Sequence, residues 1–164
     1  MRFLAIVTVL TWAVSAQAQG TQIQFGTVGQ DTGQPVEIAA DALQVSQEDA
    51  TAIFTGQVEV IQGDMRLAAG TLRVEYAEAD GEQDTGRIAR LVAGEGVTLT
   101  SGGDTAEAKD AIYDIDSGQI EMTGNVMLTQ GRNTMSSGRM VVNLETGTAR
   151  LDGRVRTILQ TGRN

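Results

Sequence analysis

The chain has 164 residues, a formal net charge of −9 and neither His nor Cys. Without these two residue types a Ser-His-Asp triad, a thiol nucleophile, a zinc finger and a disulfide framework are excluded. The acidic balance argues against a protein that neutralises nucleic-acid phosphates over a broad face, so we expect no nucleic-acid partner. An apolar fraction of 41% with 20 Gly and one Pro is typical of a single folded domain with many tight turns.

The first residues of the chain predict export. Arg2 is the only charged residue before Asp31, and an apolar run follows it over residues 3–14. This run is shorter than the roughly 20 residues that span a bilayer, and Ala16-Gln17-Ala18 has the small-x-small pattern of a cleavage site. We therefore predict a signal peptide over residues 1–18 that is cut after Ala18, with an uncleaved membrane anchor as the alternative.

Apolar residues alternate with a period of two over most of the remaining chain. Residues 19–34 are polar and rich in Gln and Gly, and we expect a flexible N-terminal arm there. After Pro35, apolar and polar residues alternate in residues 51–60, 120–129 and 149–157. This alternation is typical of half-buried strands, and no segment shows a convincing helical period. The sequence therefore predicts an all-β domain.

The alternating segments share a Gly-x-Val motif. It occurs as Gly56-Gln57-Val58, Gly124-Asn125-Val126 and Gly153-Arg154-Val155, with a weaker copy at residues 94–97 whose spacing slips by one. The valines of the last three copies are 29 residues apart, and an acidic insertion at residues 78–86 lengthens the first interval. Because Gly inside a strand marks a bend or bulge, the repeat predicts a rolled antiparallel sheet of strand-turn-strand units, open at both ends. A β-solenoid-like stack is the related possibility.

Acidic side chains are the candidates for catalysis and metal binding. Asp110 with Asp114 or Asp116 offers the carboxylate pair that glycoside hydrolysis requires. Residues 80–84 offer alternating oxygen ligands for calcium without the rest of an EF-hand loop. We interpret both groups as solvated acids of turns and strand faces. We therefore predict no catalytic residues, no metal, no cofactor and no enzymatic activity.

One face of the rolled sheet is aliphatic. Its predicted members are Val58, Val60, Leu72, Val74, Met122, Val126, Leu128, Met140, Val142, Leu151 and Val155. A filled core is one interpretation. However, a single rolled sheet must either close on itself or hold something apolar, so a trough for alkyl chains is the other. Burial of such chains contributes about 0.8 kcal/mol per methylene.

Charge is distributed unevenly along the chain. Residues 19–65 contain seven acids and no Lys or Arg, whereas residues 130–164 contain six Arg. An open sheet leaves two edges, which we place at residues 36–45 and 149–159. The candidate interface residues are Glu37, Asp41, Arg150, Arg154 and Arg156. Chance is one explanation of this asymmetry; head-to-tail self-association through strand addition is the other.

The motifs resemble a known family. Residues 35–41 and 52–63, and the repeated Thr-Gly-x-Val…Gln-Gly phrase of residues 122–131, are similar to the OstA-like domain over residues 35–160, with 161–164 as a tail. The resemblance implies an open twisted β-jellyroll. It also implies a periplasmic carrier that holds the lipid A acyl chains of lipopolysaccharide and passes them from inner to outer membrane. OstA-like domains of the membrane components would be its partners. A periplasmic structural or adaptor protein without lipid cargo is the alternative, followed by a polysaccharide-acting enzyme.

Overall fold

The computed structural model describes residues 21–27, 29–77 and 86–160, and their regular secondary structure consists of β-strands. The strands are β1 (Thr21–Gln24), β2 (Glu37–Ala39), β3 (Ala42–Ser46), β4 (Thr51–Gln62), β5 (Met65–Tyr76), β6 (Ile88–Ser101), β7 (Asp104–Ala108), β8 (Asp110–Asp114), β9 (Gln119–Gln130), β10 (Asn133–Asn143), β11 (Thr148–Asp152) and β12 (Arg156–Ile158). The predicted signal peptide, nearly all of the insertion and the predicted tail lie outside the described residues. Within them no helix is long and apolar enough to cross a membrane.

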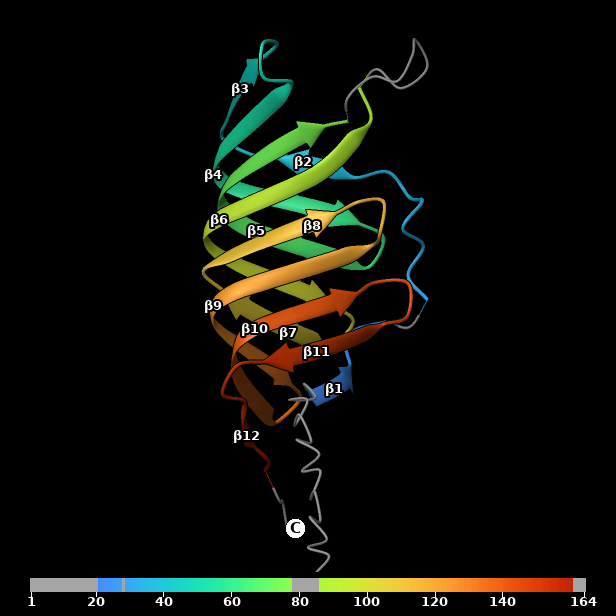
Figure 1. Ribbon diagram of the computed structural model, residues 1–164, viewed down its shortest axis with the longest axis vertical. Coiled ribbons are helices and arrows are strands. Elements are labelled where there is room, and N and C mark those ends of the chain that lie inside the picture. Colours follow the sequence, from blue (N-terminus) through green and yellow to red (C-terminus); the bar gives the residue numbers. More distant parts are fainter. Residues whose placement is uncertain (1–20, 28, 78–85, 161–164) are drawn as a thin grey trace, which may run out of the picture.

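All twelve strands belong to one antiparallel sheet. Its order is β1-β11-β10-β9-β7-β6-β5-β4-β2, while β3 pairs with β4, β8 with β6 and β9, and β12 with β10. The strands stack along the long axis of the molecule in chain order, apart from β1, which lies beside β11 at the far end (Figure 1). The sheet is a β-jellyroll, as the resemblance implied.

The long strands are folded in the middle, which turns the single sheet into two facing layers. The halves of the long strands that pair with β2, β7 and β12 form the β7 layer. The halves that pair with β3, β8 and β11 form the β8 layer, which β1 extends by pairing with β11. The strands pass from one layer to the other along one side of the molecule, the folded edge, on the left in Figure 1. Hairpin turns of both layers end on the opposite side, the open edge.

The folded edge is built from pairs of residues with positive φ. Four such pairs each directly precede a Val: Gly56 (78°) with Gln57 (46°), Glu95 (62°) with Gly96 (86°), Gly124 (85°) with Asn125 (52°), and Gly153 (79°) with Arg154 (48°). The first and third interrupt the pairing register between neighbouring strands, as expected for bulges. The slipped spacing at residues 94–97 is thereby explained, because the bend keeps its two positions and the glycine occupies the second instead of the first.

The segment expected to be a flexible arm differs from that expectation. Thr21–Gln24 forms β1 and pairs with β11 from Thr21↔Leu151 to Gln24↔Thr148. Phe25, which follows, is only 2% exposed, and its N–H donates to the carbonyl of Gly147. The alternation of Ile23 and Phe25 with polar residues is a short strand pattern. The Gln and Gly content of the surrounding segment obscured it.

Candidate lipid-binding interior

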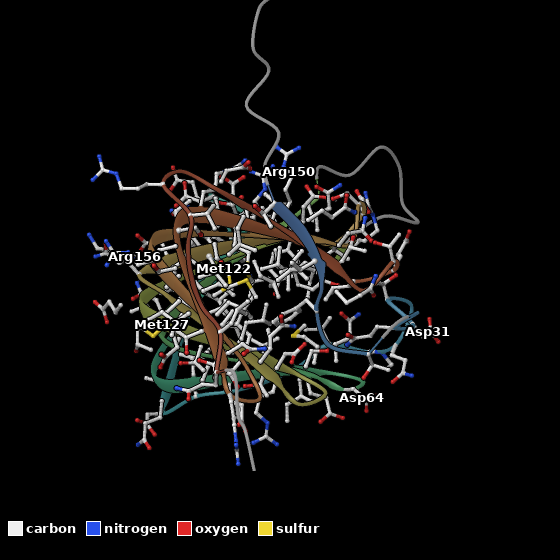
Figure 2. The ribbon with its side chains drawn as sticks, turned by 90° about the horizontal axis from the view of Figure 1, so that it is seen from below. Asp31, Asp64, Met122, Met127, Arg150 and Arg156 are labelled. Atoms are coloured by element: carbon white, nitrogen blue, oxygen red, sulfur yellow. The ribbon has the colours of Figure 1, made fainter. Side chains whose placement is uncertain are left out.

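Inward-facing side chains of the two layers form the interior. Ten of the eleven predicted trough residues are at most 1% exposed: Val58, Val60, Leu72, Val74, Met122, Val126, Leu128, Met140, Val142 and Leu151. Val155 is half-buried and packs against this core. In Figure 2, Met122 points into the interior between the layers, whereas Met127 points away from it. The alternation in the sequence therefore correctly predicted that these side chains face inward.

The inward-facing residues predicted from the sequence include none from β6 and β8. Leu91, Ala93, Val97 and Leu99 of β6 are all buried, as is Tyr113 of β8. The inward-facing residues of β6 are odd-numbered on both sides of the bend. The bend at residues 95–96 adds two residues, so the alternation continues in the same register and is visible in the sequence. The Gly-x-Val motif does not mark this strand, because its copy at residues 94–97 is irregular.

The interior is aliphatic and filled. Its buried members are Val, Leu, Ile, Met and Ala with one Phe and one Tyr; among the described residues, the buried polar side chains are Gln62, Ser101 and Ser137. No buried side-chain nitrogen or oxygen in the described part lacks a partner. Among the described residues, the one titratable side chain in this interior is that of Tyr113. The interior can accept an apolar ligand only where the two layers separate.

Polar groups of the interior gather near the open edge. Tyr113 of β8 donates its phenolic O–H to Oε1 of Gln62 at the end of β4, at 2.7 Å, so the pair joins the two layers. Each side chain is 1% exposed. Burial raises the pKa of Tyr113 to about 12, and the negative charge of Glu145 acts in the same direction. The phenol is thus a neutral hydrogen-bond donor at ordinary pH.

Two of the three acidic residues considered for catalysis, Asp114 and Asp116, have structural roles. Asp114 accepts hydrogen bonds from the backbone N–H (3.0 Å) and hydroxyl (2.7 Å) of Ser117, and these bonds lower its pKa. Asp116 forms an ion pair with Arg87. Among the described residues no group of three or more acids is arranged to hold a metal ion. The candidate calcium residues 80–84 lie outside the described residues.

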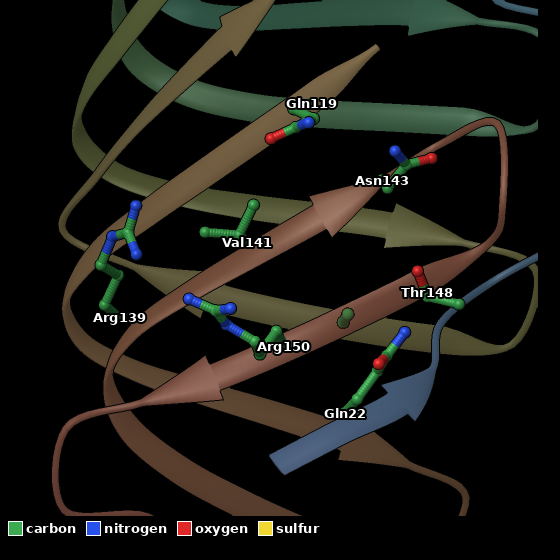
Figure 3. A pocket seen from close by; sticks show the side chains of 8 residues that line it. Gln22, Gln119, Arg139, Val141, Asn143, Thr148 and Arg150 are labelled. Carbon is green, nitrogen blue, oxygen red and sulfur yellow. The ribbon is translucent and has the colours of Figure 1, made fainter. Parts of the chain in front are cut away.

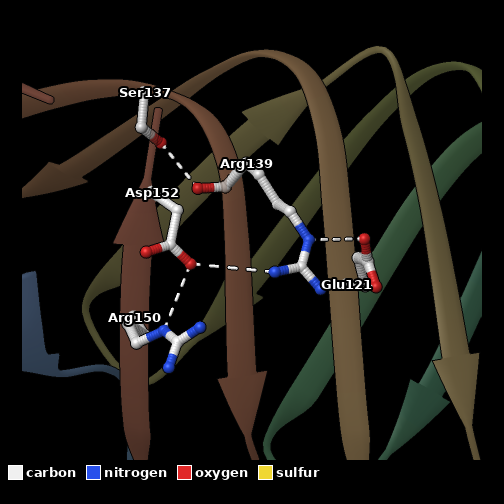
Figure 4. Close-up of polar contacts among 5 residues, drawn as sticks. All are labelled: Glu121, Ser137, Arg139, Arg150 and Asp152. Carbon is white, nitrogen blue, oxygen red and sulfur yellow. Dashed lines mark hydrogen bonds and ion pairs between the residues drawn. The ribbon is translucent and has the colours of Figure 1, made fainter. Parts of the chain in front are cut away.

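A shallow pocket lies on the outer face, across β9, β10, β11 and β1 (Figure 3). Its two arginines already have carboxylate partners. Arg139 makes a bidentate contact with Glu121 at 2.6 and 3.0 Å, and Asp152 lies 3.7 Å from Arg139 and 3.1 Å from Arg150 (Figure 4). The hydrogen bonds between Arg139 and Glu121 raise the pKa of the guanidinium and lower that of the carboxyl. The pocket therefore lacks a free cation for an anionic ligand.

The two ends of the sheet carry the predicted interface residues. At the acidic end, β2 and β3 are the outermost strands, with Glu37 on β2 and Asp41 between them, both exposed. At the basic end the outermost strands are β1 and β12, since β1 covers β11. The edge expected at residues 149–159 is thus corrected: Arg150 lies on a strand paired on both sides, whereas Arg156 lies on the exposed strand β12 and Arg154 precedes it.

Together these features define a folded, open-ended antiparallel β-jellyroll with an aliphatic interior. Residues 37–148 match the family described as LptA/(LptD N-terminal domain) LPS transport protein, and the chain belongs to this family. The resemblance to the OstA-like domain is confirmed by this match.

Two relatives illustrate the match. An uncharacterized protein of Rhizobium meliloti (strain 1021) is 33% identical over 143 residues, which cover 85% of this chain and 77% of that protein. The crystal structure of LptH from Pseudomonas aeruginosa, described as the LptA homologous periplasmic component of the conserved lipopolysaccharide transport device, has a TM-score of 0.67 at 15% identity. It matches 80% of this chain and 99% of its own chain, which shows a shared fold.

Proposed function

We propose that the protein is a periplasmic lipopolysaccharide carrier that holds lipid A acyl chains between its two layers and passes them from the inner to the outer membrane. The observation that carries the proposal is the interior itself, which is aliphatic, free of charge among the described residues and enclosed by one sheet. Alkyl chains gain about 0.8 kcal/mol per methylene on leaving water for such an environment. Membership of the LPS transport family supports this ligand class.

Both ends of the sheet favour docking by strand addition. At the acidic end β3 exposes Leu43 (56%) and Val45 (61%), and at the basic end Ile158 (57%) and Leu159 (64%) are exposed at and after β12. Unpaired edge strands of this kind are templates for a strand of another chain. We propose that these ends join copies head to tail and meet the OstA-like domains of the membrane components, so that successive interiors adjoin.

Photo-crosslinking to lipopolysaccharide tests the cargo. A photoreactive residue at Leu128, which is 0% exposed, should crosslink to lipopolysaccharide, whereas one at the adjacent Met127, which is 45% exposed, should not. The two positions share a strand and differ in the face they occupy. Equal crosslinking at both positions, or none at Leu128, contradicts the carrier. In the latter case the structural or adaptor alternative becomes the better description, since its core would simply be filled.

Sedimentation of the mature chain tests the docking. Head-to-tail contact places Glu37 and Asp41 of one copy near Arg154 and Arg156 of the next, and screening weakens exposed charge pairs. We expect concentration-dependent association at low salt that decreases at high salt and in Arg154→Glu with Arg156→Glu. Arg66→Glu, which lies outside both ends, is the matched control. A concentration-independent monomer under all conditions contradicts self-association.

A further inference from the structure

Residues 30–36, here called the strap, lie along the open edge of the molecule. They connect the segment after β1 at one end with β2 at the other, on the side where the hairpin turns of both layers end (Figure 1). Figure 2 shows Asp31 of the strap on the same side as Asp64 of the β4–β5 turn, opposite Met127 and Arg156. The strap therefore lies over the side on which no strand connects the two layers.

The strap is attached through one buried side chain. Nε2 of Gln62 donates to the strap carbonyls of Thr32 (2.8 Å) and Gln34 (2.9 Å), and Nε2 of Gln30 donates back to the carbonyl of Gln62 (2.6 Å). Oε1 of Gln62 is held by Tyr113. We call Gln62 and Tyr113 the latch, because they join the β7 layer, the β8 layer and the strap in one hydrogen-bond network.

The strap also passes close to the β8 layer. A Cβ added at Gly118, in the turn between β8 and β9, would lie 3.4 Å from Cγ2 of Thr32. Gly118 is buried although it belongs to a turn. The middle of the strap is thus attached to the end of β4 on one side and lies close to the β8–β9 turn on the other.

The filled interior requires that the layers separate before a ligand can enter. Along the folded edge this is prevented by continuous strands, whose backbones pass from one layer to the other. Along the open edge the layers are joined near the strap by hydrogen bonds of side chains. A polar head group attached to buried alkyl chains must also remain in water, and only a side without continuous backbone leaves it room. Of the two edges, both requirements select the open edge, and entry through the open ends of the sheet is the alternative that the test below distinguishes.

We propose that acyl chains enter sideways through the open edge, and that the strap is the gate, held closed by the latch. The proposal rests on the lipopolysaccharide-carrier function proposed above and specifies how that cargo reaches the interior. Loading breaks the hydrogen bonds of Gln62 to the strap, lifts Thr32 away from Gly118 and separates the layers about the folded edge. Unloading reverses these steps.

A reversible tether between the strap and the β8 layer tests the gate. The double variant Thr32→Cys with Gly118→Cys introduces two cysteines into a chain that has none. A Cβ at residue 118 would lie 3.4 Å from the position of Cγ2 of Thr32, which the sulfur of a cysteine at position 32 can occupy, so the two thiols are near enough to form a disulfide. Purified chain is assayed for binding of rough-type lipopolysaccharide in the oxidised and reduced forms. We expect the reduced form to bind like wild type and the oxidised form to bind at least tenfold more weakly. The reduced form controls for any strain at Gly118, which has a φ of +62°.

The outcomes separate the gate from the carrier. Equal binding by oxidised and reduced forms overturns the gate and leaves the carrier intact, since the chains would then enter through the open ends. Absence of binding by wild type overturns the carrier, and the gate with it. Loss of binding in the oxidised form alone supports both.

Weakening the latch provides a second measurement. Tyr113→Phe removes the hydroxyl that holds Gln62 and keeps the ring, so we expect loading of lipopolysaccharide to be several-fold faster than in wild type. Asp64→Asn, in the exposed β4–β5 turn beside Gln62, is the control and should leave the rate unchanged. An unchanged or slower rate in Tyr113→Phe, with a folded circular-dichroism spectrum, overturns the role of the latch.

Discussion

The folded edge and the open edge hold the same two layers together by different means. At the folded edge, continuous strands turn through residues with positive φ, and the geometry is specified by the backbone. At the open edge the layers meet through turns, the strap and the latch, and the geometry is specified by side-chain hydrogen bonds. The first arrangement resists separation and the second permits it. A sheet with one edge of each kind behaves as a hinged pair of layers.

The largest expected effect comes from placing a charge in the interior beside the folded edge. Val126, which is 0% exposed and follows the Gly124–Asn125 bend, has no polar partner. Val126→Asp should lower the free energy of unfolding by roughly 3–5 kcal/mol, because a buried carboxyl must be desolvated or protonated. Met127→Asp, on the outer face of the same strand, should change it by less than about 0.5 kcal/mol. Urea denaturation measures both, and similar values would refute the inward assignment.

Glycine replacements compare the two edges directly. Gly124 has a φ of +85°, and an added Cβ would lie 2.7 Å from Cβ of Lys109 on the neighbouring segment. Gly124→Val should therefore cost roughly 2–4 kcal/mol from backbone strain and steric conflict. Gly103, in the β6–β7 turn, has an ordinary φ and open space around it, so Gly103→Val should cost less than about 0.5 kcal/mol. Thermal melts followed by circular dichroism measure the loss of stability in both variants. Equal losses would contradict the difference between the folded edge and the open edge.

The latch predicts a specific alkaline sensitivity. Burial raises the pKa of Tyr113 to about 12 from 10.0. Because folding favours the neutral phenol, its contribution is complete below pH 10 and is lost as the pH rises to 12. Wild type should lose about 2 kcal/mol more than Tyr113→Phe over this interval. Urea midpoints from pH 9 to pH 12 measure the difference, and parallel profiles would place the ionisation elsewhere.

At pH 7 the same variant weakens the open edge by a smaller amount. Tyr113→Phe leaves Oε1 of Gln62 without its donor, and an unmet buried acceptor costs about 1–2 kcal/mol. Tyr76→Phe, a half-buried tyrosine of β5, is the matched control. If both variants unfold at the same urea concentration as wild type, the hydrogen bond between Tyr113 and Gln62 contributes nothing to closure.

The smallest effect is expected on the outer face. Arg139→Gln breaks the bidentate contact with Glu121, whose partners are about 41% exposed, so the loss should be below about 1 kcal/mol at pH 7. The contact lowers the pKa of Glu121, so its contribution is present at neutral pH and is lost as the pH falls through the acid range. The free energy of unfolding of this variant should therefore fall less between pH 7 and pH 3 than that of wild type. Arg66→Gln, which loses a single contact with Glu59, is the control, and its free energy of unfolding should fall as much as that of wild type. Urea denaturation at pH 7 and pH 3 measures both.

The inner face and the bends could be predicted from the sequence because both are periodic. The alternation of Val58 and Val60 or of Val126 and Leu128 is a local pattern, and the Gly-x-Val copies mark where the backbone needs positive φ. The latch could not be predicted, because Gln62 and Tyr113 lie 51 residues apart and meet only after the sheet is folded. Gln62 also has the parity of the inner face, where a polar residue has no evident purpose until its partners are known.

The pairing of β1 with β11 has a consequence for the order in which the chain folds. From β2 to β10 the strands next to one another in the sheet are also near in sequence, so each hairpin can form soon after its residues are available. Thr21, in contrast, pairs with Leu151, almost the full length of the chain away. A chain that emerges from its N-terminus first must therefore keep its first strand unpaired until β11 has arrived.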